Sequence, residues 1–553
     1  MLKIFVPETD FSSYDQFCEQ FRIVIPEAFN FAYDVVDHIA SKTPDRLALL
    51  WCNEQGEEKQ ISFTEMRQQS NRVANIFRDL GIGKGDRVML VLKRRVEFWY
   101  CLLALHRLGA ISIPATHMLT EKDIAYRNEA AGICMIVAID ENRICENIEK
   151  SRRPADSIRH LVILGQKRNG WVDLNTELSG ASHEFPRPQG DGRTHNNDIS
   201  LVYFTSGTTG MPKMVQHDFT YPLSHIITAK YWQRVKNGGL HLTLADTGWA
   251  KAVWGKIYGQ WLCGSAVMVY DYDRFIPGKL LSILEKYRVT TFCAPPTVYR
   301  FLIKDDVSKY NLSALKHCTI AGEPLNPQIY NQWLDQTGIK LAEGYGQTET
   351  TLVVGNFPWM KIKPGSMGCP SPGYDIDIID ADGKQCSIDQ PGQIVIRINR
   401  NIPTGMFRGY YQNRSLTSRI WHDGCYFTGD MASRDADGYL WFIGRADDVI
   451  KSAGYRIGPF EVEKALLDHP AVQECVVTGA PDAMRGQIVK ATVVLTQGYS
   501  GNTKLMHELQ DHVRHTTAYY KYPRIIVFVD ELPKTISGKI LRIRSGVGFG
   551  NKN

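Results

Sequence analysis

The stretch from Thr205 to Lys213 gathers side chains that suit a polyphosphate. Glycines let backbone N–H groups approach an anion, hydroxyls donate further hydrogen bonds, and a lysine adds positive charge. These residues are Thr205, Ser206, Gly207, Thr208, Thr209, Gly210 and Lys213. The P-loop pattern fails, because Pro212 and Met214 stand where it requires a glycine and a hydroxyl residue. The stretch therefore predicts a phosphate-binding loop of another kind, with a Ser/Gly-rich surface loop as the alternative.

A lysine near the end of the chain could act on charge that develops in phosphate chemistry. Lys539 follows Ser537 and Gly538, and no acidic residue lies between Lys534 and Arg544. An ammonium group on a mobile tip could offset the repulsion between a carboxylate and a phosphate as they react. The alternative is a solvated basic tail, which is common at C-termini.

Buried strands that alternate with amphipathic helices must position these residues. Continuous apolar runs are typical of strands that are buried on both faces of a parallel sheet. Such runs are Arg87–Leu92, Leu161–Leu164, Ser200–Thr205, Ala266–Tyr270 and Thr290–Ala294. The segments between them have helical spacing, and Glu97–Leu108 is expected to be a buried helix. This pattern predicts an α/β fold with largely parallel sheets.

The texture of the sequence changes near Gly365. Alternating runs predict antiparallel strands at 374–379 and 393–398, and Asp382–Gly383 and Asp437–Gly438 predict hairpin turns. A compact unit follows, with expected helices at 461–469 and 505–515 and expected strands at 474–478, 490–495 and 525–529. We predict two domains, residues 1–446 and residues 447–553.

Composition and charge exclude several classes of protein. A formal net charge of +5 is too small to indicate nucleic acid or an acidic membrane as the main partner. No pair of the 12 cysteines has C-x-x-C spacing, which argues against a zinc knuckle or a redox dithiol. The sequence contains no run of about 18 apolar residues, so no membrane span is expected. The N-terminal segment contains acids such as Glu8 and Asp10, which are uncommon in targeting peptides. The cytoplasm is therefore the expected compartment.

Six stretches, taken in order along the chain, resemble the signature motifs of the adenylate-forming enzymes. This superfamily contains acyl-CoA synthetases, firefly-luciferase-like enzymes and the adenylation domains of peptide synthetases. The stretches are Tyr203–Lys213, Ala321–Pro324, Gly344–Glu349, Tyr426–Asp430, Gly444–Pro459 and Pro533–Lys539. The resemblance covers essentially the whole chain. Two further stretches, Asp246–Lys251 and Ala294–Arg300, are most similar to medium-chain acyl-CoA synthetases.

This resemblance implies both a fold and a reaction. The implied fold is multidomain α/β: a large N-terminal domain of two α/β subdomains and a distorted β-barrel, with a small mobile α+β C-terminal domain. The implied enzyme is an ATP-dependent, AMP-forming acyl-CoA synthetase that uses Mg²⁺ and coenzyme A. Its expected substrate is a medium-chain, branched or aromatic carboxylic acid. The sequence leaves the oligomeric state open, with a homo-oligomer as one alternative.

The resemblance also assigns the reacting end of ATP. Glu349 is the expected Mg²⁺ ligand, because a hard divalent ion on a nucleotide typically takes one or two carboxylates. Thr348 is expected to donate to the α-phosphate, and Lys539 to offset charge in the adenylation step. Taken alone, the stretch Tyr345–Glu349 could instead cap a helix N-terminus.

The rest of the nucleotide is assigned in the same way. Tyr345 is expected to stack on adenine, and Asp430 is expected to bind the two ribose hydroxyls, with Arg445 near the ribose and α-phosphate. Taken alone, Asp430 could be an ordinary turn residue. The remaining expected nucleotide contacts, besides the phosphate loop, are Gly322, Glu323, Pro324 and Gln347.

Coenzyme A is expected to meet the C-terminal part of the chain. Its predicted contacts are Gly454, Tyr455, Arg456 and Arg485, where Gly454 lets the pantetheine arm pass close to the backbone. Asp447 matches the family's hinge position, about which the small domain is expected to rotate between the two half-reactions.

The acyl pocket is expected at Trp249 and Gly346. Acetyl-specific relatives carry Trp where this chain has Gly346, so the glycine predicts room for several carbons or for a branched or aromatic acid. An ordinary core tryptophan is the alternative for Trp249. Lys251 could face a polar acyl group or be solvated.

Two other functions stay open at this stage. A free-standing adenylation enzyme could load a carrier protein, although the chain ends 14 residues after Lys539 and leaves no room for a carrier domain of its own. A catalytically silent nucleotide or acyl-CoA binder would be expected to lose the lysine or the glutamate, and both Lys539 and Glu349 are present. A luciferase-like oxygenase is disfavoured by the stretches that resemble medium-chain synthetases.

Overall fold

The computed structural model describes residues 1–141, 143–154, 157–207, 210–398, 402–453, 455–534, 540 and 542, except for the side chains of 206, 207, 210 and 456. The chain forms two compact units. The first consists of Met1–Asp375 and Ile398–Gly424, and the second of Ile376–Arg397 and Cys425–Asn553.

One sheet of the first unit carries the predicted phosphate-binding stretch. Its strand order is β7 (Val172–Asp173), β6 (His160–Leu164), β5 (Met135–Ile139), β3 (Arg87–Val91), β4 (Ile111–Pro114), β8 (Ile199–Gly207), β9 (Gly210–Asp218). All neighbours are parallel except β8 and β9, which form an antiparallel hairpin. Every residue of β3 and β6 after the first is buried, which confirms the prediction of strands covered on both faces.

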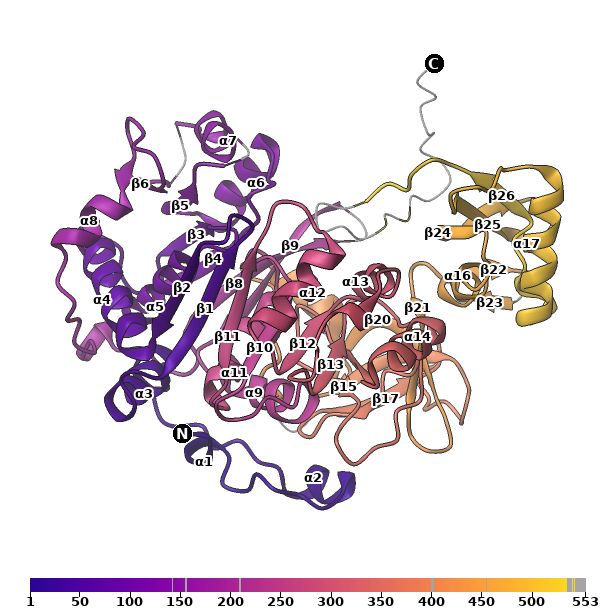
Figure 1. Cartoon of the computed structure of the whole chain (residues 1–553), viewed down its shortest axis with the longest axis horizontal. Helices are drawn as coiled ribbons and strands as arrows, with labels where there is room; N and C mark the ends of the chain where they lie inside the picture. The colour runs from indigo at the N-terminus through magenta and orange to yellow at the C-terminus, as the bar shows by residue number, and fades with distance from the viewer. Residues whose placement is uncertain are drawn as a thin grey trace. The chain divides into compact units, whose positions relative to one another are not determined.

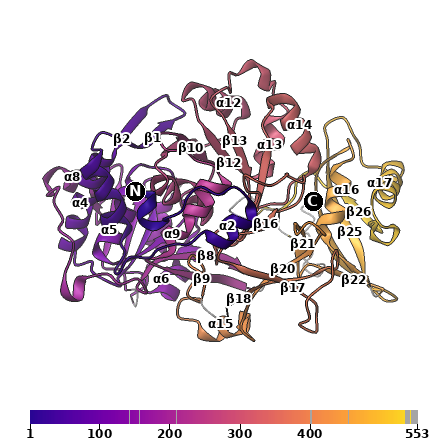
Figure 2. The ribbon, with the colours of Figure 1, turned by 90° about the horizontal axis from the view of Figure 1, so that it is seen from below.

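The other sheet of the first unit ends in the strand that precedes Glu349. Its order is β16 (Cys369–Pro370), β15 (Val354–Gly355), β14 (Leu341–Tyr345), β13 (His317–Ile320), β12 (Thr291–Ala294), β10 (Leu240–Thr243), β11 (Ala266–Asp271), β1 (Leu47–Asn53), β2 (Glu58–Ser62). The strands from β14 to β1 are parallel, and helices α12 (Pro277–Lys286), α13 (Pro296–Leu302) and α14 (Pro327–Thr337) cover one face (Figure 2).

The predicted buried helix is confirmed as α5 (Glu97–Leu108), in which every residue after Glu97 is buried. It lies beside α4 (Phe63–Asp79), as Figure 1 shows. The remaining helices of this unit are α1 (Leu2–Phe5), α2 (Tyr14–Gln20), α3 (His38–Lys42), α6 (Glu121–Ala131), α7 (Ile144–Ser151), α8 (Leu174–Gly180), α9 (Tyr221–Ile226), α10 (Lys251–Lys256), α11 (Gly259–Leu262) and α15 (Arg414–Ile420). Two π-helical turns, η1 (Ala32–Asp37) and η3 (Ile227–Trp232), and two 3₁₀ turns, η2 (Gly190–Gly192) and η4 (Val307–Lys309), complete it.

The second unit contains two sheets whose strands are antiparallel, except that β26 (Ile525–Phe528) runs parallel to β25 (Gly486–Leu495). Strands β17 (Asp375–Ile379), β18 (Gly392–Arg397) and β20 (Cys425–Arg434) lie side by side, and β21 (Leu440–Arg445) pairs with β20 across the predicted Asp437–Gly438 turn. Gly438 has φ +84°, which a glycine adopts without strain. The short strand β19 (Trp421–His422) directly precedes β20 in the chain.

The end of the second unit has a core of its own. Strands β23 (Tyr455–Ile457), β22 (Ile450–Ser452), β25 (Gly486–Leu495) and β24 (Val472–Asp482) form a sheet in this order, and β26 (Ile525–Phe528) pairs with β25. Helices α16 (Pro459–Leu467) and α17 (Thr503–Thr516) pack Val462, Leu466 and Leu509 against this sheet (Figure 1), and η5 (Tyr519–Lys521) follows. The mixed α/β class with a smaller C-terminal part is confirmed, while the boundary at Asp447 stays a prediction.

No helix in the described part of the chain is long and apolar enough to cross a membrane.

Candidate functional site

The phosphate-binding stretch forms the closed end of the β8–β9 hairpin. Thr205 lies opposite Lys213, and Gly207 lies opposite Gly210. Thr208 and Thr209 are outside the described residues, as are the side chains of Ser206, Gly207 and Gly210. The carbonyl of Pro212 accepts a hydrogen bond from the Tyr126 hydroxyl at 2.8 Å, which ties the return strand to α6. The hairpin therefore brings Thr205 and Lys213 together, as the sequence predicts.

The turn after β14 carries Thr348 and Glu349, and other segments hold its backbone at two points. The fully buried His217 of β9 donates from Nε2 to the Thr348 carbonyl at 2.8 Å. The backbone N–H of Phe407 donates to the Glu349 carbonyl at 2.8 Å. The turn thus lies beside the hairpin, although 131 residues separate His217 from Thr348.

The ring of His217 is neutral. Burial lowers its pKa to about 4, and the ring stacks on Tyr221 with centroids 3.8 Å apart. A carbonyl oxygen can only accept, so Nε2 carries the proton in this tautomer. Neither the charge nor the hydrogen bond of His217 changes between about pH 5 and pH 9, and the turn is held in the same way across this range.

The Glu349 side chain has a buried tyrosine as its partner. The hydroxyl of Tyr410 donates to Glu349 Oε1 at 2.9 Å, and Tyr410 is only 5% exposed. The ammonium of Lys213 lies 5.4 Å from the centre of the same tyrosine ring, within cation–π distance. Sequence reasoning missed both His217 and Tyr410, because nothing in either residue's local pattern marks it as a partner of this turn.

The predicted adenine wall lies at the carboxyl end of β13. Gly322 has φ +100°, and Glu323 accepts a hydrogen bond at Oε2 from the Thr297 hydroxyl at 2.7 Å. The ammonium of Lys251 donates to the Ala321 carbonyl, so Lys251 supports this wall instead of being simply solvated. Pro324, Tyr345 and Gln347 are half-buried, and the Gln347 N–H bonds to the Thr350 hydroxyl at 3.0 Å.

Asp430 and Arg445 form a pair within the second unit. They lie opposite each other on β20 and β21, and Arg445 Nη1 donates to Asp430 Oδ1 at 3.0 Å and to the Thr428 carbonyl at 3.1 Å. A Cβ added to Gly429, which has φ +73°, would lie 2.6 Å from Arg445 Nη2, so the glycine is needed for this pairing. A buried carboxylate with an arginine beside it fits the predicted contact with ribose and α-phosphate.

The expected acyl end differs from the sequence prediction in one respect. The space in front of Gly346 is filled: an added Cβ would meet the Thr351 carbonyl and lie 2.6 Å from the Trp254 indole. Trp254 is 6% exposed and packs edge-on against Trp232. Trp254, which the sequence did not single out, therefore occupies the room that the glycine leaves. Trp249 is half-buried in the turn before α10.

The predicted coenzyme A residues that are described lie at one end of the small sheet. Tyr455 is 44% exposed and stacks on Tyr520 with ring centroids 4.0 Å apart. Arg485 is exposed, and its carbonyl accepts from the Ala453 N–H at 2.9 Å, which joins its turn to the β22–β23 turn. Gly454 and the side chain of Arg456 lie outside the described residues.

Lys539 lies outside the described residues, but its flanks are held by ion pairs. Lys534 binds Glu474 at 2.9 Å on one side. Arg542 binds Glu463 at 2.6 Å on the other side. Burial raises the pKa of Glu463, and the Arg542 guanidinium opposes this rise. Asp447 is exposed in the turn between β21 and β22.

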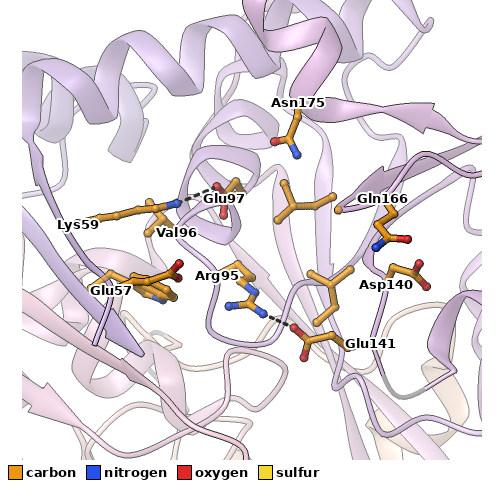
Figure 3. A pocket seen from close by; sticks show the side chains of 13 residues that line it. Glu57, Lys59, Arg95, Val96, Glu97, Asp140, Glu141, Gln166 and Asn175 are labelled. Carbon is orange, nitrogen blue, oxygen red and sulfur yellow. Dashed lines mark hydrogen bonds and ion pairs between the residues drawn. The ribbon is translucent and has the colours of Figure 1, made fainter. Parts of the chain in front are cut away.

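A separate polar pocket of about 530 Å³ lies at the carboxyl ends of β3, β5 and β6 (Figure 3). Four of its charged side chains are paired within its own wall: Arg95 binds Glu141, and Lys59 lies 3.9 Å from Glu97. None of the predicted site residues is among those that line it.

The turn fits a magnesium ion that also binds nucleotide. The described residues include no cluster of three or more His, Cys, Asp or Glu side chains that could hold a metal. An ion at Glu349 would therefore complete its shell with phosphate oxygens and water, which is how Mg²⁺ usually binds in nucleotide sites. The carboxylate oxygens of Glu349 are the kind of ligand that Mg²⁺ prefers.

Known proteins resemble the chain over nearly its whole length. The AMP-binding enzyme family matches residues 36–411, and the AMP-binding enzyme C-terminal domain matches residues 461–539. The chain is 41% identical to acyl-coenzyme A synthetase ACSM3, mitochondrial, of Homo sapiens, over 96% of this chain and 92% of that one. It is 42% identical to acyl-coenzyme A synthetase ACSM4, mitochondrial, of Homo sapiens, over 94% of this chain and 90% of that one.

Solved structures agree with these relatives. The Brucella canis acyl-CoA synthetase superposes with a TM-score of 0.74 at 31% identity, over 96% of this chain and 97% of that one. The anthranilate CoA ligase AuaEII in complex with anthranoyl-AMP superposes with a TM-score of 0.84 at 27% identity, over 93% of this chain and 96% of that one. These similarities confirm the predicted enzyme class and its use of ATP, Mg²⁺ and coenzyme A. The chain therefore belongs to the AMP-binding enzyme family, among its AMP-forming acyl-CoA synthetases.

Proposed function

We propose that the enzyme activates a medium-chain, branched or aromatic carboxylic acid in two steps at one site. First, a carboxylate oxygen of the acid attacks the α-phosphorus of ATP, which forms an acyl-adenylate and releases pyrophosphate. The coenzyme A thiol then attacks the acyl carbon, loses its proton and displaces AMP. The observation that carries the proposal is one tyrosine, Tyr410, that contacts both the Glu349 carboxylate and the Lys213 ammonium.

The first step joins two anions, so the site must offset their repulsion. Lys213 and the hairpin hydroxyls are proposed to bind the phosphates. Glu349 would hold Mg²⁺, and Thr348 would donate to the α-phosphate. Magnesium, when bound, supplies the charge that neutralises the phosphate oxygens. Tyr345 orients adenine, and Asp430 orients the ribose. Lys539 is proposed to bridge the carboxylate and the α-phosphate.

The second step is proposed to use another face of the C-terminal part. The exposed Tyr455 and Arg485, which lie on joined turns, support a coenzyme A surface there. The exposed position of Asp447 in the β21–β22 turn supports a swivel that exchanges this face for Lys539. We retain Gly454 and Arg456 as part of this surface on the resemblance alone.

The Trp254 indole, which fills the space beside Gly346, is proposed to form the end of the acyl pocket. Each buried CH₂ contributes about 0.8 kcal/mol, so the depth in front of this indole sets the chain-length preference. Trp249 and Gly346 are proposed to line the same pocket. The bound anthranoyl-AMP of the similar ligase places an aromatic acid among the candidates to be tried first.

A pyrophosphate-release assay tests the proposal directly. The panel is acetate, butyrate, isobutyrate, hexanoate, octanoate, benzoate and phenylacetate, each with and without coenzyme A. We expect turnover that requires coenzyme A and peaks on a C4 to C8 or aromatic acid. Slow release without a coenzyme A effect would point to a carrier-loading enzyme, and no release from any acid would contradict the proposed substrate class.

Two finer predictions accompany this function. We propose a cytoplasmic location and assembly into a homo-oligomer. Cell fractionation tests the first, and light scattering of the eluting protein tests the second.

A further inference from the structure

The position of Tyr410 is set by the backbone of the phosphate-binding hairpin. Segment 408–411 runs antiparallel to β9, with Tyr410 opposite Val215. The Arg408 N–H donates to the Gln216 carbonyl at 2.9 Å, and the Tyr411 N–H donates to the Met214 carbonyl at 2.8 Å. Because these bonds flank Tyr410 on both sides, its backbone is fixed relative to β9, the strand that carries Lys213.

Tyr410 and the nearby Phe407 each donate a hydrogen bond to Glu349. The Tyr410 hydroxyl donates to the side-chain oxygen Oε1 at 2.9 Å, and the Phe407 N–H donates to the main-chain oxygen at 2.8 Å. A hydrogen bond to a carboxylate is stronger than one between neutral groups, and burial of Tyr410 shields it from competing water. The carboxylate is therefore held in one orientation before any ligand arrives.

The two faces of this arrangement serve two parts of one ligand. The hydroxyl edge of Tyr410 meets the carboxylate that the proposed function gives to the metal. The face of its ring meets the ammonium that the proposed function gives to the phosphates, at 5.4 Å. One rigid side chain thus fixes the spacing between an anionic metal ligand and a cationic phosphate ligand.

We propose that Tyr410 is a positioning residue for the metal–ATP complex, which orients Glu349 through its hydroxyl and Lys213 through its ring. This inference rests on the proposed role of Glu349. Partners that orient a metal ligand typically contribute about 10- to 100-fold to metal affinity. Removing the hydroxyl alone should therefore weaken the metal and leave metal-free nucleotide binding unchanged, whereas removing the ring should weaken both.

The test is Mn²⁺ binding to the enzyme in the presence of a non-reactive ATP analogue, measured by electron paramagnetic resonance. Tyr410→Phe removes the hydroxyl and keeps the ring, and Tyr410→Leu removes both. Tyr411→Phe is the matched control, because it removes a hydroxyl from the neighbouring residue. We expect Mn²⁺ affinity to fall about 10-fold or more in Tyr410→Phe and to stay at the wild-type level in Tyr411→Phe. Thermal melting checks that each variant is folded.

Analogue binding without metal separates the two contacts. Tyr410→Phe should match the wild type, and Tyr410→Leu should bind the analogue several-fold more weakly. Mn²⁺ affinity of a folded Tyr410→Phe within twofold of the wild type would overturn the inference, provided that Glu349→Gln loses the ion. Wild-type Mn²⁺ affinity in Glu349→Gln would instead overturn the proposed metal role of Glu349, and this inference with it.

Discussion

The Thr348–Glu349 turn of the first unit and the flanks of Lys539 in the second unit are held by different kinds of bond. Neutral donors hold the turn: the His217 ring, the Phe407 N–H and the Tyr410 hydroxyl. Ion pairs hold the flanks of Lys539, and their cations, Lys534 and Arg542, are partly exposed. Salt screens such pairs, whereas buried hydrogen bonds between a neutral group and a carbonyl are insensitive to salt.

This contrast teaches how one site can serve two half-reactions. In the proposed function, ATP and its metal need the same orientation of the Glu349 carboxylate in every turnover, and its packed, uncharged partners supply that orientation. The proposed function needs Lys539 in only one half-reaction, so ion pairs that can open and close suit its segment. The variants below probe the two regions in turn.

The largest effect is expected from a substitution of Lys539. Lys539→Ala should slow adenylation about 100- to 1000-fold, because one charge-stabilising donor is lost from the transition state. Acyl-adenylate supplied from outside should still be converted to thioester at near the wild-type rate. Lys504→Ala, an exposed lysine of α17 in the same unit, is the control for loss of surface charge. Equal loss of both half-reactions would contradict the role of Lys539.

A smaller effect is expected when the ion pair between Arg542 and Glu463 is removed. Arg542→Ala should slow adenylation about 10-fold and also destabilise the second unit, because Glu463 would be left buried without its cation. Glu463→Gln in the same background removes that buried charge and should restore stability but not activity. Adenylation by Arg542→Ala at the wild-type rate would show that this tie does not position the lysine.

The proposed end of the acyl pocket in the first unit can be tested by substituting Trp254. Trp254→Ala should shift preference toward longer acids, by about 4-fold in kcat/KM for each CH₂ that the opened space can bury. Trp359→Phe, a conservative change at a half-buried tryptophan of the same unit, should leave the chain-length profile unchanged. Gly346→Trp cannot be accommodated while the Trp254 indole stays in place. An unchanged profile in Trp254→Ala would place the end of the pocket elsewhere.

The arrangement of elements follows from local patterns, whereas the holding contacts do not. The continuous apolar run at Arg87–Val91 and the all-round apolar segment at Glu97–Leu108 predict a buried strand and a buried helix, because burial on every face leaves a local trace. Tyr410 and Glu349 are 61 residues apart, and Trp254 of α10 meets Gly346, which follows β14. Such contacts depend on how distant segments pack, which a single sequence does not record.

The smallest effect is expected from the protonation of buried histidines in the first unit, which should change stability more than activity. Burial lowers the pKa of five histidines of the first unit to about 3 or 4: His106, His217, His225, His241 and His317. In the unfolded chain these groups bind protons at about pH 6.5. Between these values the unfolded state binds more protons, so the free energy of unfolding should fall as the pH drops below about 6.5.

Tryptophan fluorescence can follow this loss of stability, because all but Trp441 of the 11 tryptophans lie in the first unit. We expect the melting temperature to fall steadily from pH 7 to pH 5, and His217 to impose no step on the activity profile between pH 6.5 and pH 9. A melting temperature that does not change from pH 7 to pH 5 would contradict the burial of these histidines as neutral groups.

The proposal that the C-terminal part presents Lys539 to one half-reaction and the coenzyme A surface to the other is tested most directly by two variants. Both half-reactions are measured in Lys539→Ala and in Asp447→Pro. Adenylation is followed by pyrophosphate release in a single turnover, and thioester formation by adding coenzyme A to supplied acyl-adenylate. Lys539→Ala should lose adenylation and keep thioester formation. Asp447→Pro, which freezes φ in the β21–β22 turn, should keep adenylation and slow thioester formation far more. If each variant slows both half-reactions by the same factor, the C-terminal part does not present different groups to the two steps.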